Sequence, residues 1–460
     1  MIFPRLILAD EYRSGKVPSG VLIAGALKEL GYKLKLFVGN ADDVTVRALQ
    51  VVCNQPVTLL DPILCGGQPN LRWLFESVAS PDCINLILVN LGGRVLEDAP
   101  FKVPKECALL SEWLDCDVIP IIYSDASSTL TVRSVAEAVR QIEDGGKPVR
   151  SILFRSILNN REYELVDREA GRNFSAVSAG SMPSTVERDL PPLEPLCSDD
   201  SAHVTLPLRS ASKQLAGMKH LVNWAIFSAI AQAAPMWPRQ QRLSEPITDS
   251  GKVNIAVVRH HALSIAGDGT EHLLRVLGCN IVDIMLVGNI THSVPIHGVY
   301  LPHGLAYIAL PKFFSNIYLK TMLTRGSTGG SFLLADGGSS AILGDRIVLP
   351  EGRGEGRGFG VLPFSGIYKK TSFGNVKKMR AVSRKENPLL SGSKECVFGY
   401  GSDSYSLAGT GEDDECWVTA DALDPKKTSL DGWCKKRILA TSMRIEPWSA
   451  PEMFRRWLEG

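Results

Sequence analysis

The sequence predicts an α/β protein with two domains, each built around a mainly parallel sheet. The first reason is that short runs of β-branched residues and leucine, apolar on both faces, alternate with helical stretches. The second is that 460 residues exceed what one hydrophobic core usually supports. The third is that the strand–helix pattern begins again near residue 253, after a segment that breaks it.

The first domain opens with an apolar run that fits a buried strand, followed by a loop and a helix. Pro18 suits the first turn of this helix and Gly31 its end. A further helix is expected over residues 132–142, after the fourth strand. The strands of this domain are predicted at 2–9, 32–38, 84–90, 118–123 and 149–158.

The middle of the chain departs from this alternation. Residues 172–201 are rich in Ser and Pro, so an irregular segment is expected there. A helix over 215–234 follows, and 239–252 is predicted to be a linker. The first domain is therefore expected to span residues 1–238.

The second domain is expected to span residues 253–460. Its strands are predicted at 253–258, 281–287, 298–301 and 332–335. From residue 361 onward the chain is richer in glycine, aromatic and turn residues, which predicts added antiparallel strands.

Composition narrows the classes of function. A net charge of +1 gives no support to binding of nucleic acid or anionic membranes, and 45% hydrophobic residues are ordinary for a globular protein. No apolar run reaches the roughly 18 residues of a membrane helix, and the first residues lack a signal peptide's pattern. The ten cysteines contain no Cys-x-x-Cys pair, which favours buried thiols over a metal site. The predicted location is the cytoplasm.

A phosphate-binding loop is a candidate after the first strand, because Gly15 and Lys16 precede a helix. The working motif requires Ser or Thr where Val17 stands and glycine where Asp10 stands. Valine cannot coordinate Mg²⁺, and the acidic side chain of Asp10 would repel a polyphosphate. Two alternatives stay open: a solvated loop with a surface lysine, or a degenerate site that still takes ATP and Mg²⁺.

A turn between a strand and a helix is predicted around Asp336. The apolar run before it and the glycines after it form an elbow, which in many enzymes projects a nucleophile from a sheet. Asp336 is expected at its tip, but a carboxylate is a poor replacement for a thiol or hydroxyl in acyl transfer. Ser339 and Ser340 are the nearby hydroxyls, either as nucleophiles or as capping groups of the following helix.

Several segments of the first domain resemble those of one enzyme family. They are Phe37-Val38-Gly39-Asn40-Ala41-Asp42, Leu59-Leu60-Asp61-Pro62, Leu91-Gly92-Gly93 and the strand that runs from Ser151 to Asn159. In the second domain the corresponding segments are Gly298-Val299-Tyr300-Leu301-Pro302-His303-Gly304, Asp336-Gly337-Gly338, Gly360-Val361-Leu362-Pro363 and the C-terminal stretch from Ile438 to Ile445.

Taken in order, these segments resemble the cobyrinic acid a,c-diamide synthase family. The resemblance implies a P-loop NTPase-like sheet of the dethiobiotin-synthetase type and a class I glutamine-amidotransferase-like, flavodoxin-type sheet. Members of that family use ATP, Mg²⁺ and glutamine-derived ammonia to amidate carboxylates of a tetrapyrrole. The implied pathway is cobalamin biosynthesis.

The resemblance also assigns positions. Asp336 stands at the family's nucleophile position and Arg444 at its base position, with Gly304 and Gly337 on the oxyanion side. No histidine follows His303, and a permanently charged arginine cannot accept a proton, although it could pair with Asp336. The candidates for contact with substrate are Asn40, Asp42, Asp61, Arg353 and Arg357.

Arg353 and Arg357 belong to the most basic part of the chain, together with Lys369, Lys370 and Lys377. This part is either a solvated loop or a surface that meets the carboxylates of a tetrapyrrole, since guanidinium groups suit bidentate contacts with carboxylates.

The favoured hypothesis is a catalytically diverged relative, a pseudoenzyme that binds a tetrapyrrole or a partner subunit without hydrolysing glutamine. That partner would be an intact paralogue or a second copy of the chain. The alternatives are an active ATP-dependent a,c-diamide synthase that uses ammonia or glutamine, and a scaffold that keeps the fold for assembly.

Overall fold

The chain forms two compact units in a computed structural model. The structure describes residues 1–10, 17–39, 43–91, 103–124, 128–145, 147–157, 159–174, 176–188, 190–193, 196, 202–263, 269–287, 293–329, 331–370, 376–392, 395–409 and 415–460. One unit consists of Met1–Ile63, Val78–Leu196 and Asp200–Gln240, and the other of Leu64–Ser77, Cys197–Asp199 and Gln241–Gly460.

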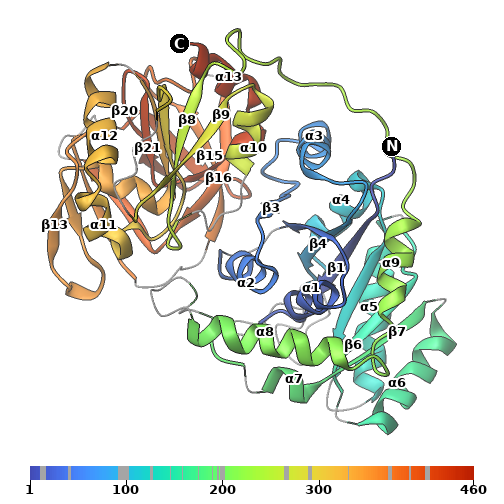
Figure 1. Ribbon diagram of the computed structural model, residues 1–460. Coiled ribbons are helices and arrows are strands. Elements are labelled where there is room, and N and C mark those ends of the chain that lie inside the picture. The colour runs from blue at the N-terminus through green and yellow to red at the C-terminus, as the bar shows by residue number, and fades with distance from the viewer. Residues whose placement is uncertain are drawn as a thin grey trace. The chain divides into compact units, whose positions relative to one another are not determined.

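The first unit is built on a seven-stranded sheet in the order β3-β2-β4-β1-β5-β6-β7 (Figure 1). All its strand pairs are parallel. The central strands are buried along their length, as the continuous apolar runs predict. The strands are β1 (Arg5–Asp10), β2 (Leu34–Gly39), β3 (Val57–Leu59), β4 (Ile84–Asn90), β5 (Val118–Tyr123), β6 (Ser151–Ile157) and β7 (Val177–Pro183).

Helices cover both faces of this sheet. A Cβ at Gly20 of α1 would touch Leu88 of β4, and one at Gly39 would touch Val89 of β4 and Leu110 of α4. Because successive side chains of a strand point to opposite faces, α1 and α4 lie on opposite sides. The helices of this unit are α1 (Ser19–Glu29), α2 (Asp43–Cys53), α4 (Lys105–Leu114), α5 (Ser128–Glu143), α6 (Asn160–Asn173), α7 (Ser184–Arg188), α8 (Ala202–Gly217) and α9 (Trp224–Gln232).

The region after β6 is more regular than the sequence predicts. Strand β7 and helix α7 lie within residues 172–201, where an irregular segment was expected. Small residues such as Gly180 let β7 pass close to the backbone of Leu221, so its composition resembles a loop. The single helix expected over 215–234 was also wrong, because α8 ends at Gly217 and a turn separates it from α9.

The second unit contains a six-stranded sheet in the order β20-β21-β11-β10-β8-β9. Its pairs are parallel except for β20 with β21. Both units therefore confirm the predicted α/β class. The strands are β8 (Asn254–Arg259), β9 (Asn280–Met285), β10 (Gly298–Leu301), β11 (Phe332–Asp336), β20 (Trp433–Lys435) and β21 (Ile438–Thr441).

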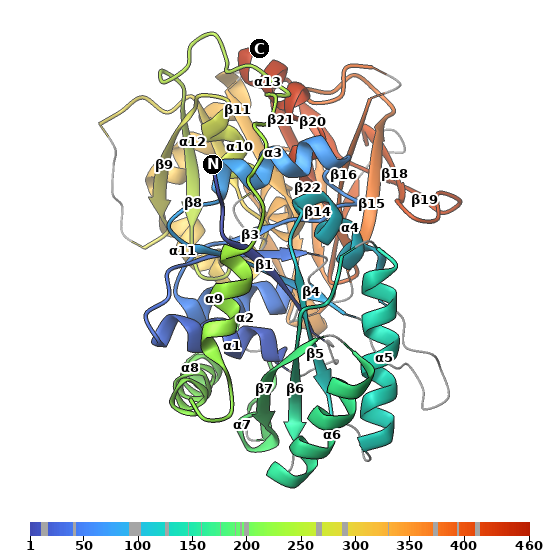
Figure 2. The same cartoon turned by 90° about the vertical axis from the view of Figure 1, so that its right-hand side faces the viewer.

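Two further sheets form the later half of this unit and confirm the expected antiparallel additions (Figure 2). One has the order β13-β12-β14-β17, and the other β19-β18-β15-β16-β22. Their strands are β12 (Arg346–Val348), β13 (Glu355–Arg357), β14 (Phe364–Tyr368), β15 (Val376–Ser383), β16 (Cys396–Ser402), β17 (Tyr405–Gly409), β18 (Trp417–Asp421), β19 (Thr428–Asp431) and β22 (Arg444–Glu446).

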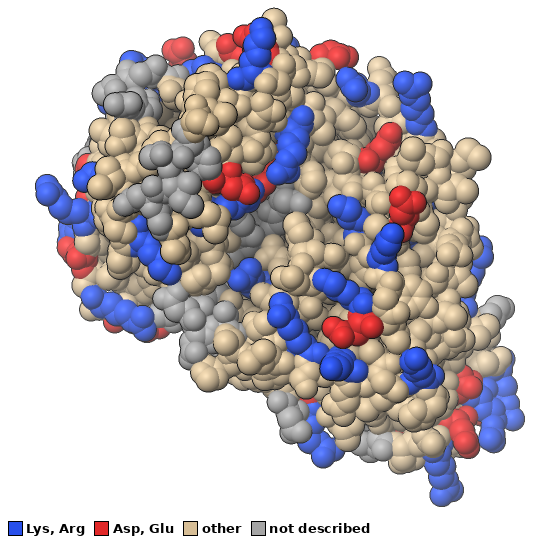
Figure 3. All heavy atoms as spheres, viewed as in Figure 1, with Lys and Arg blue, Asp and Glu red and all other residues tan. Residues whose placement is uncertain are grey.

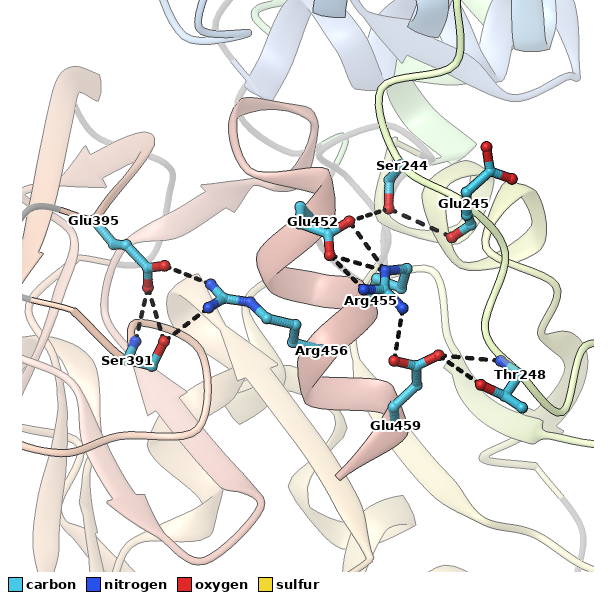
Figure 4. A network of polar contacts seen from close by, with 9 residues as sticks. All are labelled: Ser244, Glu245, Thr248, Ser391, Glu395, Glu452, Arg455, Arg456 and Glu459. Carbon is cyan, nitrogen blue, oxygen red and sulfur yellow. Dashed lines mark hydrogen bonds and ion pairs between the residues drawn. The ribbon is translucent and has the colours of Figure 1, made fainter.

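The last helix of the second unit contacts two other segments (Figure 4): its Arg456 forms an ion pair with Glu395, and two of its carboxylates accept hydrogen bonds from the segment that contains Ser244 and Thr248. Arg455 bonds to Glu452 and Glu459, and these carboxylates accept hydrogen bonds from Ser244 and Thr248. The helices of this unit are α3 (Gln68–Val78), α10 (Gly269–Val276), α11 (Leu310–Ser315), α12 (Ile317–Gly329) and α13 (Pro451–Glu459).

Charged side chains of both signs are interspersed on the face drawn in Figure 3. Within the described part of the chain, every helix is too short or too polar to cross a membrane.

Candidate functional site

Each of the two mainly parallel sheets has one pair of neighbouring strands from which the chain continues in opposite directions along the sheet. In the first unit these strands are β4 and β1, and in the second they are β10 and β8. Ligand sites of open α/β sheets lie outside the carboxyl ends of strands at such a position. The rims of the two sheets at the carboxyl ends of their strands, called here the two sheet edges, are therefore the candidate sites.

Asp10 ends β1, and its carboxylate is completely buried. Its Oδ1 accepts a hydrogen bond from Arg155 Nη1 at 2.9 Å, and its Oδ2 accepts one from the Gly20 N–H at 2.9 Å. Burial raises the pKa of Asp10, and the Arg155 guanidinium and the Gly20 amide oppose that rise. Since Gly20 lies in the first turn of α1, an internal carboxylate occupies a place where the helix dipole favours an anion.

A second carboxylate, that of Glu187 in α7, completes this network. Ser19 Oγ donates to Glu187 Oε1 at 2.6 Å, and Ser156 Oγ donates to Oε2 at 2.9 Å. Arg155 Nε lies 3.5 Å from Glu187 Oε1. The first turn of α1 is thus bonded to two of the protein's own acidic side chains, and an added phosphate would meet both negative charges.

A cavity of about 470 Å³ lies beside this network, and its wall includes Val17, Tyr123, Arg155 and Arg188. The Arg155 guanidinium is 5.6 Å from the centre of the Tyr123 ring. Of the predicted phosphate loop, Gly15 and Lys16 lie outside the described residues, and Val17 is buried in the wall.

The other predicted contact residues of the first domain are only partly described. Asn40 and Asp42 lie outside the described residues. Asp61 is buried, and its Oδ1 accepts a hydrogen bond from the Ile63 N–H at 2.9 Å. This contact closes a local turn, which is how aspartate commonly acts in loops.

In the second unit, Arg353 lies in the connection between β12 and β13, and Arg357 is the last residue of β13. The Arg353 guanidinium is 3.7 Å from the Glu351 carboxylate and is largely exposed. Arg357 is exposed on β13, opposite Arg346 of β12. Both arginines are therefore in solvated positions.

The turn after β11 reverses at Gly337 and not at Asp336. Asp336 has extended backbone angles, with φ −123° and ψ 153°, whereas Gly337 has φ +60°. The expectation that Asp336 projects from the tip of the elbow was wrong, because its side chain is only 1% exposed. A left-handed backbone costs glycine little, so the reversal falls one residue later. The helix that follows is the 3₁₀ helix η3 (Gly337–Leu343).

His303 fills the space in front of this turn. A Cβ built on Gly337 would lie 2.0 Å from His303 Nδ1, so no side chain fits there. The same nitrogen accepts a hydrogen bond from the Gly338 N–H at 3.2 Å, and the Tyr405 hydroxyl lies 3.4 Å from it. The apex of the elbow therefore carries no reactive group, and a neighbouring amide is bonded to an imidazole.

Sequence reasoning missed His303 as a member of this site. It comes from the loop after β10, where the resembled family has glycine, and this replacement by a large side chain was the available signal. A histidine does therefore lie at the elbow, although it does not come from the C-terminal position expected for a base.

Asp336 is bonded to two neighbouring strands inside the unit. The Tyr300 hydroxyl of β10 donates to Oδ1 at 3.4 Å, and the Ile445 N–H of β22 donates to Oδ2 at 3.2 Å. Burial raises the pKa of Asp336 to about 6, and among the opposing influences His303 is the largest, ahead of the Ile445 amide and Arg444.

Arg444 is buried at the start of β22, and its guanidinium lies 4.2 Å from the centre of the Tyr400 ring. It is close enough to Asp336 to lower the pKa of that carboxyl. A guanidinium on an aromatic face is a stabilising contact and offers no site to accept a proton.

The remaining predicted groups are held by the backbone. A Cβ on Gly304 would lie 2.0 Å from the Ala262 carbonyl oxygen, because an isolated bridge joins Gly304 to Leu263. Ser339 Oγ donates to the Leu301 and Asp336 carbonyls at 2.9 Å, and Ser340 Oγ donates to the Gly337 carbonyl at 2.5 Å. These buried serine hydroxyls donate to carbonyls and do not cap free amides.

A second cavity, of about 520 Å³, lies against the two added sheets. Its wall includes Lys369, Lys377, Tyr405, Asp431 and Met443. Tyr405 also lies beside His303, so this cavity adjoins the elbow. Asp403 lies in the same wall, so two lysines and two aspartates line this cavity.

No protein-family model matches the chain, and no curated protein matches it in sequence. Among solved structures, PurLQS from Thermotoga maritima is similar, with 11% identity over 45% of this chain and 98% of its own, and a TM-score of 0.34. A glutamine amidotransferase from Thermotoga maritima has 12% identity over 45% and 81%, with a TM-score of 0.31. The MinD cell division protein of Aquifex aeolicus has 16% identity over 46% and 96%, with a TM-score of 0.27. Because all three TM-scores are below 0.5, no property of these proteins is transferred to this chain.

Proposed function

We propose that this protein is a catalytically diverged relative of ATP- and glutamine-dependent amidoligases that binds an anionic ligand and does not hydrolyse glutamine. The ligand class proposed is a tetrapyrrole with carboxylate side chains, and the alternative occupant is a partner subunit. The observation that carries the proposal is the glycine at the apex of the elbow, with His303 in the space that a nucleophile would need.

Acyl transfer from glutamine requires a nucleophile and a group that takes its proton. Gly337 has no side chain, and Asp336 next to it is bonded to Tyr300 and Ile445 within the unit. The Gly338 amide, which could stabilise an oxyanion, is bonded to His303. These contacts favour a site closed by its own side chains.

The first unit supports the same proposal for ATP. Asp10 and Glu187 are bonded to the start of α1, and an incoming triphosphate would have to displace Asp10 from Gly20 and Arg155. We therefore expect no tight binding of ATP in the presence of Mg²⁺.

Binding of a tetrapyrrole rests on charge and space. Lys369 and Lys377 share the wall of the cavity next to the elbow and would meet carboxylates of the ligand. Arg353 and Arg357 lie on a separate exposed hairpin, so they are less suited to that role than the sequence suggests.

The decisive experiment measures ammonia release from glutamine by the purified full chain. We expect no release above a buffer control. Release that depends on the protein and is abolished by His303→Ala or Asp336→Ala would overturn the proposal and favour an active enzyme.

Ligand binding is tested separately by absorbance titration with a corrinoid and with a sirohydrochlorin-type ligand. We expect a spectral shift that weakens in a Lys369→Gln/Lys377→Gln variant and persists in an Arg353→Gln control. Absence of any shift with either ligand would favour a scaffold or a partner-binding subunit.

A further inference from the structure

Two cysteines of the second unit, Cys416 and Cys434, are neighbours in space. The Cys416 N–H donates to the Gly432 carbonyl at 2.7 Å, and a Cβ on Gly432 would lie 3.2 Å from Cys416 Sγ. Cys434 follows two residues later, and its thiol is hydrogen-bonded to that of Cys416. The segment that contains Lys385 and Glu386 runs along both, because the Lys385 N–H bonds to the Cys416 carbonyl and Cys434 Sγ lies 3.7 Å from the Glu386 carbonyl.

The two thiols differ in exposure and acidity. Cys416 is buried, whereas Cys434 is partly exposed. The hydrogen bond between them lowers the pKa of Cys434 and raises that of Cys416, and the Lys385 ammonium lowers the pKa of Cys434 further. Burial instead raises the pKa of four other cysteines to about 12, namely Cys53, Cys107, Cys116 and Cys279. Thiolate character and exposure together determine which cysteine reacts first.

We propose that Cys434 and Cys416 form a reversible intramolecular disulfide, with Cys434 as the attacking thiol and a small-molecule disulfide such as oxidised glutathione as the oxidant. The Cys434 thiolate attacks one sulfur of the oxidant, the S–S bond breaks, and one glutathione leaves as a thiolate. Cys416 then transfers its proton to solvent and attacks Cys434 Sγ, which expels the second glutathione. Two protein thiols are oxidised while one glutathione disulfide is reduced to two thiols.

The cross-link would bracket a turn that supports the elbow. Asp431, next to Gly432, accepts hydrogen bonds from Thr441 Oγ1 at 2.6 Å and from the Met443 N–H at 3.2 Å. The Met443 carbonyl in turn accepts the Gly337 N–H at 3.3 Å. Asp431 and Met443 also line the second cavity. The residues next to the thiol pair therefore form part of the proposed ligand site.

The experiment treats the full chain with oxidised glutathione and maps peptides without reduction. We expect a single cross-linked pair that contains Cys416 and Cys434, and loss of two hydrogen atoms from the intact mass. Cys416→Ser should instead leave a persistent glutathione adduct on Cys434, because the thiol that would displace the glutathione is missing. Cys396→Ser, which removes another partly exposed cysteine, should leave the cross-link unchanged.

Two outcomes would overturn the proposal. One is a wild-type protein that gains glutathione at Cys434 but never forms the cross-link, and the other is equal cross-linking of Cys416 in Cys434→Ser. Lys385→Gln should slow modification of Cys434 by iodoacetamide at neutral pH several-fold, because it removes the nearby positive charge. The near-ultraviolet circular dichroism of each variant verifies that it is folded.

Discussion

Both sheet edges bury an aspartate at the end of a strand, but the two carboxylates have different partners. Asp10 faces a buried guanidinium and a helix amide, at 2.9 Å each. Asp336 faces a phenol and a strand amide at longer distances, and its pKa is raised to about 6. Burial raises the pKa of both carboxyls. At Asp10 a directly hydrogen-bonded guanidinium opposes this rise, whereas Asp336 is hydrogen-bonded to neutral groups and is affected by the nearby His303 and Arg444.

The largest expected effect tests the first edge. Arg155→Met should lower the free energy of unfolding by about 3–5 kcal/mol, because it leaves Asp10 buried without its counter-charge. Urea titration monitored by circular dichroism measures this loss. Arg150→Met removes an exposed partner of Asp117 and should cost at most about 1 kcal/mol. Equal effects of the two substitutions would contradict the view that the buried pair is structurally dominant.

The second prediction concerns pH and the Asp336 edge. Folding favours the protonated form, since the folded pKa of about 6 exceeds the ordinary value of 3.8. The associated stability is present below pH 3.8 and is lost as the pH rises through 6. Asp336→Asn removes this dependence, so its stability relative to wild type should rise by about 2 kcal/mol between pH 4 and pH 7. A difference that stays constant across this range, measured by urea titration at each pH, would refute the assignment.

The third prediction probes the packing of the elbow. Gly337→Ala should destabilise the protein because its methyl group would overlap His303. His303→Ala should relieve part of this cost, which gives a favourable coupling of about 1–3 kcal/mol in a double-mutant cycle. Thermal unfolding of the four proteins measures it. Additive effects would mean that His303 does not occupy the space in front of Gly337.

The smallest effect is expected for the removal of an arginine that forms ion pairs at the surface. Arg455→Met should change the free energy of unfolding by less than about 1 kcal/mol, since its partners Glu452 and Glu459 are partly exposed (Figure 4). The Thr248 amide, which donates to Glu459, should exchange with solvent faster. Hydrogen exchange detects this change, and a large global loss of stability would show that the helix network matters more than its exposure suggests.

The strands that the sequence predicted best are those buried on both faces. The predictions for β4 and β5 match the observed bounds, since continuous apolar runs specify buried strands directly. Strand β7 was missed because it is rich in small and polar residues, which resemble a loop. At Gly180 a small residue is required, since the backbone of Leu221 lies close to it. The break between α8 and α9 was missed as well, since the apolar pattern alone does not locate the turn that follows Gly217.

In the candidate sites, too, local features can be predicted from the sequence, whereas contacts between distant residues cannot. That a glycine pair follows Asp336 and that no histidine follows His303 can be read from the sequence. The Asp10–Arg155 pair joins residues far apart in the chain, and no local pattern connects them. His303 was likewise placed at the elbow only by the parallel alignment of β10 with β11.

The sequence by itself determined the α/β class, the position of most strands along the chain and the absence of a cysteine at the elbow, because these depend on residue type and on local periodicity. Only the tertiary structure decided that Gly337 forms the apex, that His303 fills the space before it and that Arg155 neutralises Asp10. The physical reason is that burial and counter-charge depend on which segments meet across the sheet, and those meetings are fixed when the strands align.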